Sequence, residues 1–205
     1  MDVKFIEVVA IGFIGILMIY LTRHVIKGKT STALRLWFVS FCMYVVYYWL
    51  AGGIYLLSEV EVIFYALLWS IPAILSYWIV VKMAEKEGAM PFFRWWTPFL
   101  IALVFAVILD SIAGTAGWYT YNLTAISTGT FVSPIGGVTI PALLVLMLGV
   151  MMLGVIFLSE VVFYELKKKF GGTTATYILI GLSFIAGGLI WILTQAFVGL
   201  ISRYA

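Results

Sequence analysis

Six apolar runs, each about 20 residues long, constrain the fold of this chain more than any other feature of its sequence. As a helix, a run of that length crosses roughly 30 Å of hydrocarbon. Because 64% of the residues are hydrophobic and only 10% are charged, there is too little polar surface to cover a water-soluble globule. We therefore predict an all-α polytopic membrane protein, a single transmembrane helical-bundle domain over residues 1–205. The expected helices are 5–26, 34–57, 62–84, 92–116, 138–169 and 174–202.

Lysine and arginine are distributed unequally between the two sides of the predicted membrane. Ten of the 12 basic residues lie in or beside the turns that follow the first, third and fifth helices, and only Lys4 and Arg203 lie on the other side. Cytoplasmic segments carry the excess of basic residues in membrane proteins. We therefore predict a multi-pass protein of the cell membrane, built as three helical hairpins with cytoplasmic basic turns and both termini outside. We expect no cleavable signal peptide, because the first four residues are both acidic and basic.

The scarcity of cysteine and histidine excludes several classes of site. Cys42 is the one cysteine and His24 the one histidine, so this chain alone offers neither a disulfide nor a cluster of thiolate or imidazole ligands. No nucleotide-binding loop or nucleophile triad is present either. We predict no metal and no cofactor. The net charge of +3 reflects the basic turns, and we predict no nucleic-acid partner.

Asp110 is the only carboxylate inside an otherwise unbroken apolar run. Burying Asp at hydrocarbon depth costs several kcal/mol unless it is paired, protonated or facing water, so a functional role is the first interpretation. The alternative is a structural hydrogen bond to Ser111, Thr115 or a neighbouring helix. The loop 117–137 that follows carries no charge. We expect this loop to fold back as a lid or a re-entrant segment.

The predicted orientation places several polar residues in one layer, near the outer face of the membrane. Asp110 lies in the outer third of its helix, and Glu7 and Gln195 lie near the outer ends of the first and last helices. If the first and fourth helices are neighbours, Asp110 and Glu7 could meet, and burial would favour the neutral acid needed for general-acid catalysis. The residues expected just above this layer are Trp118, Tyr119, Tyr121 and Asn122.

Aromatic residues follow one face of the second predicted helix, at helical spacing. They are Trp37, Phe41, Tyr44, Tyr48 and Tyr55. One interpretation is packing against neighbouring helices or lipid. The other is the wall of a pocket for a flat conjugated ligand, with Tyr44 and Tyr48 as binding residues. Farther along the chain, Glu160 and Glu165 are expected to pair with the lysines one turn on.

The segment from Asp110 to Pro141 resembles part of the lycopene cyclase domain family of membrane proteins, and is similar to the membrane carotenoid hydratases. The similar features are Asp110, the run Gly117-Trp118-Tyr119-Thr120-Tyr121-Asn122, Gly129, and the run Gly137-Val138-Thr139-Ile140-Pro141. In the cyclases a pair of glutamates follows the proline, whereas Ala142 and Leu143 follow it here. The resemblance implies a carotenoid or another long isoprenoid lying between the helices, with Asp110, together with Glu7, as the candidate acid.

Two functions follow from these observations. In the first, the bundle binds a lipophilic isoprenoid or carotenoid-like molecule among membrane lipids, and either holds it or converts it by acid catalysis. In the second, the chain is a non-catalytic accessory subunit of a larger membrane complex, or a small transporter. Glycines of the fifth and sixth helices, such as Gly149, Gly154 and Gly187, fit association with a second copy or a partner membrane subunit. They fit packing within the chain equally well.

Overall fold

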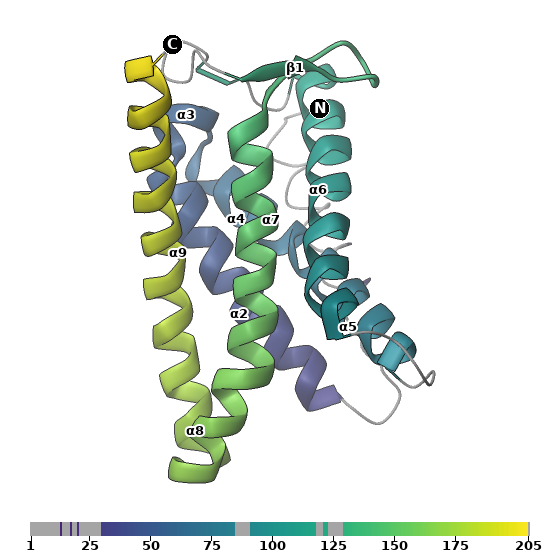
Figure 1. Cartoon of the computed structure of the whole chain (residues 1–205), viewed down its shortest axis with the longest axis vertical. Coiled ribbons are helices and arrows are strands. Elements are labelled where there is room, and N and C mark those ends of the chain that lie inside the picture. Colours follow the sequence, from purple (N-terminus) through teal and green to yellow (C-terminus); the bar gives the residue numbers. More distant parts are fainter. Residues whose placement is uncertain are drawn as a thin grey trace.

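The computed structural model describes residues 13, 17, 20, 30–84, 91–117, 121–122 and 129–204. Within them, five helical segments are long and apolar enough to cross a membrane. These segments are 32–50, 59–80, 95–115, 142–170 and 172–200. They stand side by side as a helical bundle with a small β-hairpin across one end (Figure 1). The first predicted span, 5–26, lies almost entirely outside the described residues, so five of the six spans can be compared with the prediction.

The second predicted helix is divided in two. α2 covers Thr30–Leu50, and after a turn at Ala51 the short α3 covers Gly52–Tyr55. Leu56 then adopts a left-handed conformation with φ of 49°, which ends α3 and turns the chain back. The prediction of one continuous helix over 34–57 is therefore wrong at its end. The paired glycines 52 and 53 lower the helical preference there.

The third predicted span is also divided, where its proline requires it. α4 covers Glu59–Leu68 and begins with a capping box, in which Ser58 and Glu61 exchange hydrogen bonds. α5 covers Ser70–Ala84. Pro72 has no N–H to donate to the carbonyl group of Leu68, and the helix is interrupted at Trp69. Pro72 therefore accounts for this break.

A β-hairpin replaces the predicted start of the fifth helix. α6 covers Pro91–Thr115, close to its predicted bounds. β1 (Thr130–Val132) then pairs antiparallel with β2 (Thr139–Pro141), with Thr130 opposite Pro141. α7 covers Ala142–Phe157, so the helix begins after Pro141 and the predicted start at residue 138 is wrong. Gly136 and Gly137 both have positive φ, which makes the tight hairpin turn possible.

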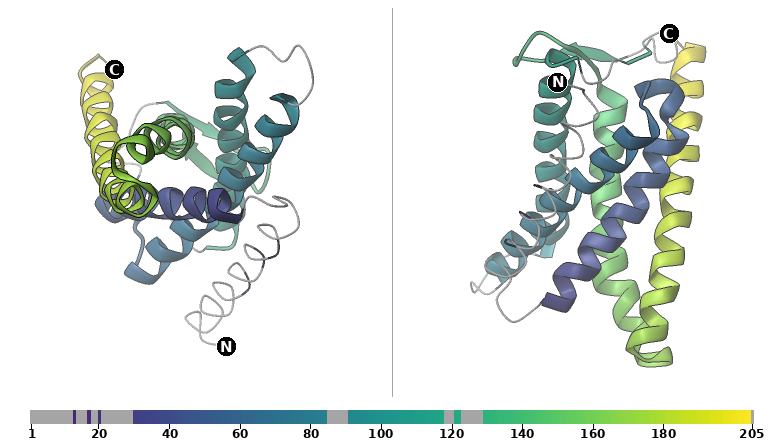
Figure 2. Two further views of the ribbon diagram at one scale, coloured as in Figure 1. Left: turned by 90° about the horizontal axis from the view of Figure 1, so that it is seen from below. Right: turned by 180° about the vertical axis from the view of Figure 1, so that it is seen from behind.

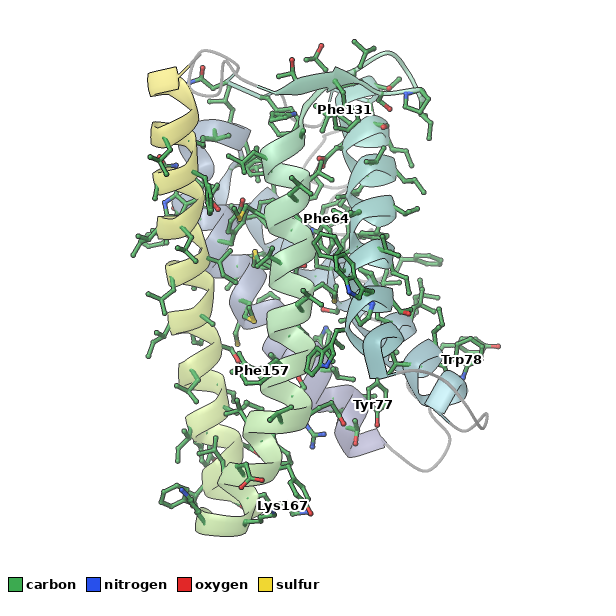
Figure 3. The ribbon with its side chains drawn as sticks, viewed as in Figure 1. Phe64, Tyr77, Trp78, Phe131, Phe157 and Lys167 are labelled. Carbon is green, nitrogen blue, oxygen red and sulfur yellow. The ribbon has the colours of Figure 1, made fainter. Side chains whose placement is uncertain are left out.

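The last two spans form a long helical hairpin. α7 continues through the π-helix η1 (Leu158–Val162) into α8 (Phe163–Phe170). Gly171 turns the chain at a φ of 78°, and α9 (Gly172–Tyr204) returns along the bundle. We call the end that carries Lys167, Lys168 and Lys169 the basic end, and the end that carries β1 and β2 the hairpin end. Figure 3 shows Lys167 and Phe131 at these opposite ends.

α2 occupies the centre of the bundle and packs against α4, α5, α7 and α9 (Figure 2). Small residues allow the closest approaches. A Cβ atom at Gly187 would lie 2.5 Å from the carbonyl oxygen of Met43, so α9 and α2 meet backbone to backbone. A Cβ atom at Gly149 would lie 2.8 Å from the ring of Phe99 on α6. At these two positions, packing within the chain accounts for the glycines.

Candidate functional site

Asp110 lies on α6 near the hairpin end, and only 1% of its surface is exposed. The Tyr121 hydroxyl donates a hydrogen bond of 2.5 Å to its Oδ2 atom. The neighbouring hydroxyls are used elsewhere, since Ser111 donates to the carbonyl oxygen of Val107 and Thr115 to that of Ser111. The carboxyl group is therefore buried among protein groups at the end away from the lysines and fixed by a phenol from the following loop.

Four tyrosines, which we call the tyrosine cluster, surround this carboxyl group: Tyr47, Tyr48, Tyr55 and Tyr121. The ring centres of Tyr121 and Tyr55 are 5.3 Å apart, and those of Tyr55 and Tyr48 are 5.0 Å apart. Tyr47 meets Tyr55 edge to face at 6.5 Å. Asp110 interacts electrostatically with the hydroxyls of both Tyr47 and Tyr48. One carboxyl group thus lies among aromatic faces and phenolic hydroxyls.

A second set of rings connects the tyrosine cluster to the centre of the bundle. Trp69 donates from Nε1 to the Tyr48 hydroxyl at 2.7 Å, and its ring stacks on Tyr44 with centres 4.6 Å apart. The Tyr44 hydroxyl donates to the carbonyl oxygen of Leu148 at 3.0 Å. Tyr44 therefore packs in the core with its polar group satisfied, as the packing interpretation expects. Tyr48 accepts from Trp69 and also interacts electrostatically with Asp110.

The loop after α6 is fastened to α3 at Asn122. Its backbone N–H donates to the carbonyl oxygen of Ile54 at 2.8 Å, and its side-chain amide donates to that of Gly53 at 3.4 Å. These bonds place Tyr121 between Asp110 and Tyr55. Asn122, predicted as a binding residue, thus holds the loop in place. We call this pair of hydrogen bonds the Asn122 clamp.

The β-hairpin packs on the end of α6. The hydroxyls of Ser133 and Ser111 lie 2.5 Å apart, and the backbone N–H of Ile135 donates to Ser133 Oγ at 3.0 Å. A Cβ atom at Gly136 would lie 1.9 Å from Thr115 Oγ1, which shows how closely the turn fits the helix. In its described residues, the uncharged loop folds back over the bundle as expected of a lid.

The structure does not bring every predicted residue to this site. Gln195 is exposed on α9, and the adjacent Thr194 takes the buried position, where its hydroxyl donates to the carbonyl oxygen of Ile190 at 2.8 Å. Gln195 is therefore not among the buried residues around Asp110, because depth along a helix does not specify which face a residue occupies. The predicted residues that lie outside the described ones are Glu7, Trp118 and Tyr119.

Sequence analysis did not assign three of the residues around Asp110 to the site. They are Tyr47, Tyr55, which contacts Tyr121, and Trp69. A signal for Tyr47 existed, since it lies one turn before Ala51 and adjacent to Tyr48 in a tyrosine-rich stretch. Trp69 gave no such signal, because its partners become neighbours only when α5 packs on α2. Among the described residues, no group of three or more His, Cys, Asp or Glu residues could hold a metal ion.

The ion pairs near the basic end also differ from expectation. Glu160, in η1, lies 3.5 Å from the guanidinium group of Arg35 on α2, and that group also lies 4.0 Å from the centre of the Phe163 ring. This partner on α2 was not predicted. Glu165 pairs with a lysine one turn on, as predicted, with its carboxylate 3.0 Å from Lys168.

No family model, curated protein or solved structure matches this chain.

Proposed function

We propose that this protein binds a long lipophilic molecule of the isoprenoid or carotenoid class beside Asp110, within its helix bundle. The observation that carries the proposal is a carboxyl group, 1% exposed, held by the Tyr121 hydroxyl among aromatic rings in a membrane-type bundle. A buried acidic group within a membrane span is a functional candidate by default. The resemblance of residues 110–141 to the lycopene cyclase domain family favours this ligand class.

The same surroundings suit acid chemistry on such a ligand. A neutral carboxyl group can transfer its proton to a carbon–carbon double bond, which leaves a carbocation on the ligand. The faces of Tyr48 and Tyr55 would stabilise that positive charge. Loss of a proton from an adjacent carbon then returns a proton to the carboxylate. The net change is an isomerisation or a ring closure, and no co-reactant is needed.

The proposal includes a placement in the cell membrane. Lys167, Lys168 and Lys169 gather at one end of the described bundle, and basic residues are concentrated on the cytoplasmic side of membrane proteins. We therefore place the basic end in the cytoplasm and the hairpin end outside, with a sixth span formed by residues 5–26. Asp110 would then lie in the outer part of the membrane, beneath the β-hairpin.

Pigment extraction from a carotenoid-producing host tests the proposal. We expect the purified wild-type protein to carry or convert an isoprenoid, and an Asp110→Asn variant to lose at least tenfold of the bound or converted product. Gln195→Ala serves as the control, because this side chain is exposed on α9 at a similar predicted depth. An Asp110→Asn protein that folds and matches the wild type in pigment content would contradict the proposal.

One observation favours a second function, that of an accessory subunit. In α9 only 17% of the spanning window is buried inside the described bundle, against 39% to 61% for the other spans. A partner subunit or a second copy could cover this apolar face, although lipid covers such faces equally well. Purification from native membranes in mild detergent distinguishes the two functions. A stoichiometric partner chain supports the subunit, and a lone protein loaded with pigment supports the first proposal.

A further inference from the structure

Four serines of the bundle core share an unusual property. Each is fully buried, and its hydroxyl oxygen has no hydrogen-bond partner in the described part of the protein. A buried hydroxyl without a partner costs free energy, and buried polar groups in proteins are paired with protein or with ordered water in the great majority of cases. We call these residues the unpaired serines: Ser40, Ser70, Ser76 and Ser159.

Other buried hydroxyls on helices of the same chain donate a hydrogen bond within their own helix. Ser183 donates to the carbonyl oxygen of Leu179 at 2.7 Å, and Thr194 donates to that of Ile190 at 2.8 Å. This bond to the carbonyl group four residues earlier satisfies a helical hydroxyl without any external partner. The unpaired serines do not use it. Their oxygens are therefore available to another group inside the bundle.

Two of the unpaired serines are adjacent in sequence to residues that interact with Arg35. Ser159 directly precedes Glu160 in η1, and π-helical turns of this kind are frequent at functional sites. Ser76 directly precedes Tyr77, whose hydroxyl interacts electrostatically with Arg35. Figure 3 shows Tyr77 in the half of the bundle nearer the basic end. The Nε atom of Arg35 is a further buried donor without a partner among the described residues.

The other two lie in the sequence next to or between residues that connect Arg35 with the surroundings of Asp110. Ser40 lies on α2 between Arg35 and Tyr44. Ser70 directly follows Trp69, which stacks on Tyr44 and donates to Tyr48, and Tyr48 interacts electrostatically with Asp110. From the level of Arg35 to that of Tyr48, α2 rises about 20 Å, at 1.5 Å per residue. The unpaired serines lie on α2, α5 and η1, and α2 packs against both of the other elements.

We propose that the unpaired serines bind internal water molecules, which form a hydrated path from the Arg35–Glu160 pair to the surroundings of Asp110. Each water would join a serine hydroxyl to a second buried polar group, as buried waters in proteins commonly do. The path would connect the basic end to Asp110 and carry protons to its carboxyl group. That last use depends on the proposed function, whereas the hydration itself does not.

Radiolytic footprinting tests the path directly. Brief X-ray irradiation converts bound water into hydroxyl radicals where it sits, so side chains next to internal water become oxidised although they are buried. Trp69 and Tyr77, which adjoin Ser70 and Ser76, are the reporters, and mass spectrometry locates the oxidation. We expect both to be oxidised in the wild-type protein in nanodiscs. Labelling should fall at least threefold at Tyr77 in Ser76→Ala and at Trp69 in Ser70→Ala.

Ser183→Ala is the matched control, because it removes a buried hydroxyl that is already bonded within its own helix. We expect this variant to keep the wild-type labelling of both reporters. Reporters that stay at the unirradiated level in the wild type would overturn the proposal, even if the variants fail to fold. Equal labelling in all four proteins, or a loss that Ser183→Ala produces equally, would also overturn it. Pigment content is measured separately, so an absent ligand with persistent labelling refutes the proposed function alone.

Discussion

Two pairs of buried polar groups, one in each half of the bundle, differ in their protein partners. Toward the hairpin end, the carboxyl group of Asp110 and the hydroxyl of Ser133 have defined protein partners, Tyr121 and Ser111. Toward the basic end, Ser76 and Ser159 have none among the described residues. Satisfied polar networks fix a unique arrangement, whereas buried groups without protein partners call for water. The comparison separates a carboxyl group that protein groups position from serine hydroxyls suited to hydration.

The largest expected effect concerns the fit of the hairpin on α6. Gly136→Ala introduces a Cβ atom 1.9 Å from Thr115 Oγ1 at a φ of 72°, so we expect it to destabilise the protein by about 2 to 3 kcal/mol. Gly137→Ala is the control, because its φ is also positive but no atom lies within 4 Å of the added Cβ. Unfolding in mixed micelles measures both. Equal losses would mean that the hairpin does not pack on α6 as described.

An intermediate effect is expected for the phenol that holds Asp110. Tyr121→Phe keeps the ring beside Tyr55 but removes the hydrogen bond to the carboxyl group, so we expect a loss of about 1 to 2 kcal/mol in unfolding free energy. Tyr164→Phe should change stability by less than about 0.5 kcal/mol, since Tyr164 is 59% exposed on α8. If the two substitutions have the same small effect, Asp110 is not fixed by Tyr121.

The smallest expected effect shows whether water binds the hydroxyl of Ser76, near the basic end. If Ser76 binds water, Ser76→Ala removes a hydroxyl that is hydrogen-bonded to that water. The substitution should then lower the free energy of unfolding by about 0.5 to 1 kcal/mol. Removal of a hydroxyl that is buried and dry would instead leave stability unchanged or raise it. Chemical denaturation of Ser76→Ala and wild type in parallel provides the measurement. A more stable variant would remove the distinction between the two halves.

The spans and the burial of Asp110 could be predicted because each depends on local sequence. The length of an apolar run indicates a helix that crosses a membrane, and Pro72 indicates a break in such a helix. A single carboxylate within an apolar run is expected to be buried with the run. The partners of these residues could not be predicted in the same way. Arg35 and Glu160 are 125 residues apart in the chain, and only the packing of α2 beside η1 brings them together.

Two further errors have identifiable physical causes. The run 138–141 is apolar and continuous with the helix after it, so hydropathy alone does not reveal that the pairing of β1 with β2 holds it as a strand. Gln195 was placed by its depth, and a shift of one residue, about 100° around the helix, separates its exposed position from the buried one of Thr194. In the first case the type of secondary structure was mispredicted, and in the second the face of the helix. Hydropathy does not encode either of them.

The Asn122 clamp determines how a ligand could reach Asp110. Its hydrogen bonds to Gly53 and Ile54 tie the loop that carries Tyr121 to the turn that carries Tyr55, so the two rings separate only if the clamp opens. While it is closed, entry from the aqueous phase at the hairpin end would have to displace Tyr121 from the carboxyl group. A molecule dissolved in the bilayer can instead enter sideways between helices. For the proposed ligand, the closed clamp therefore favours entry through the lipid.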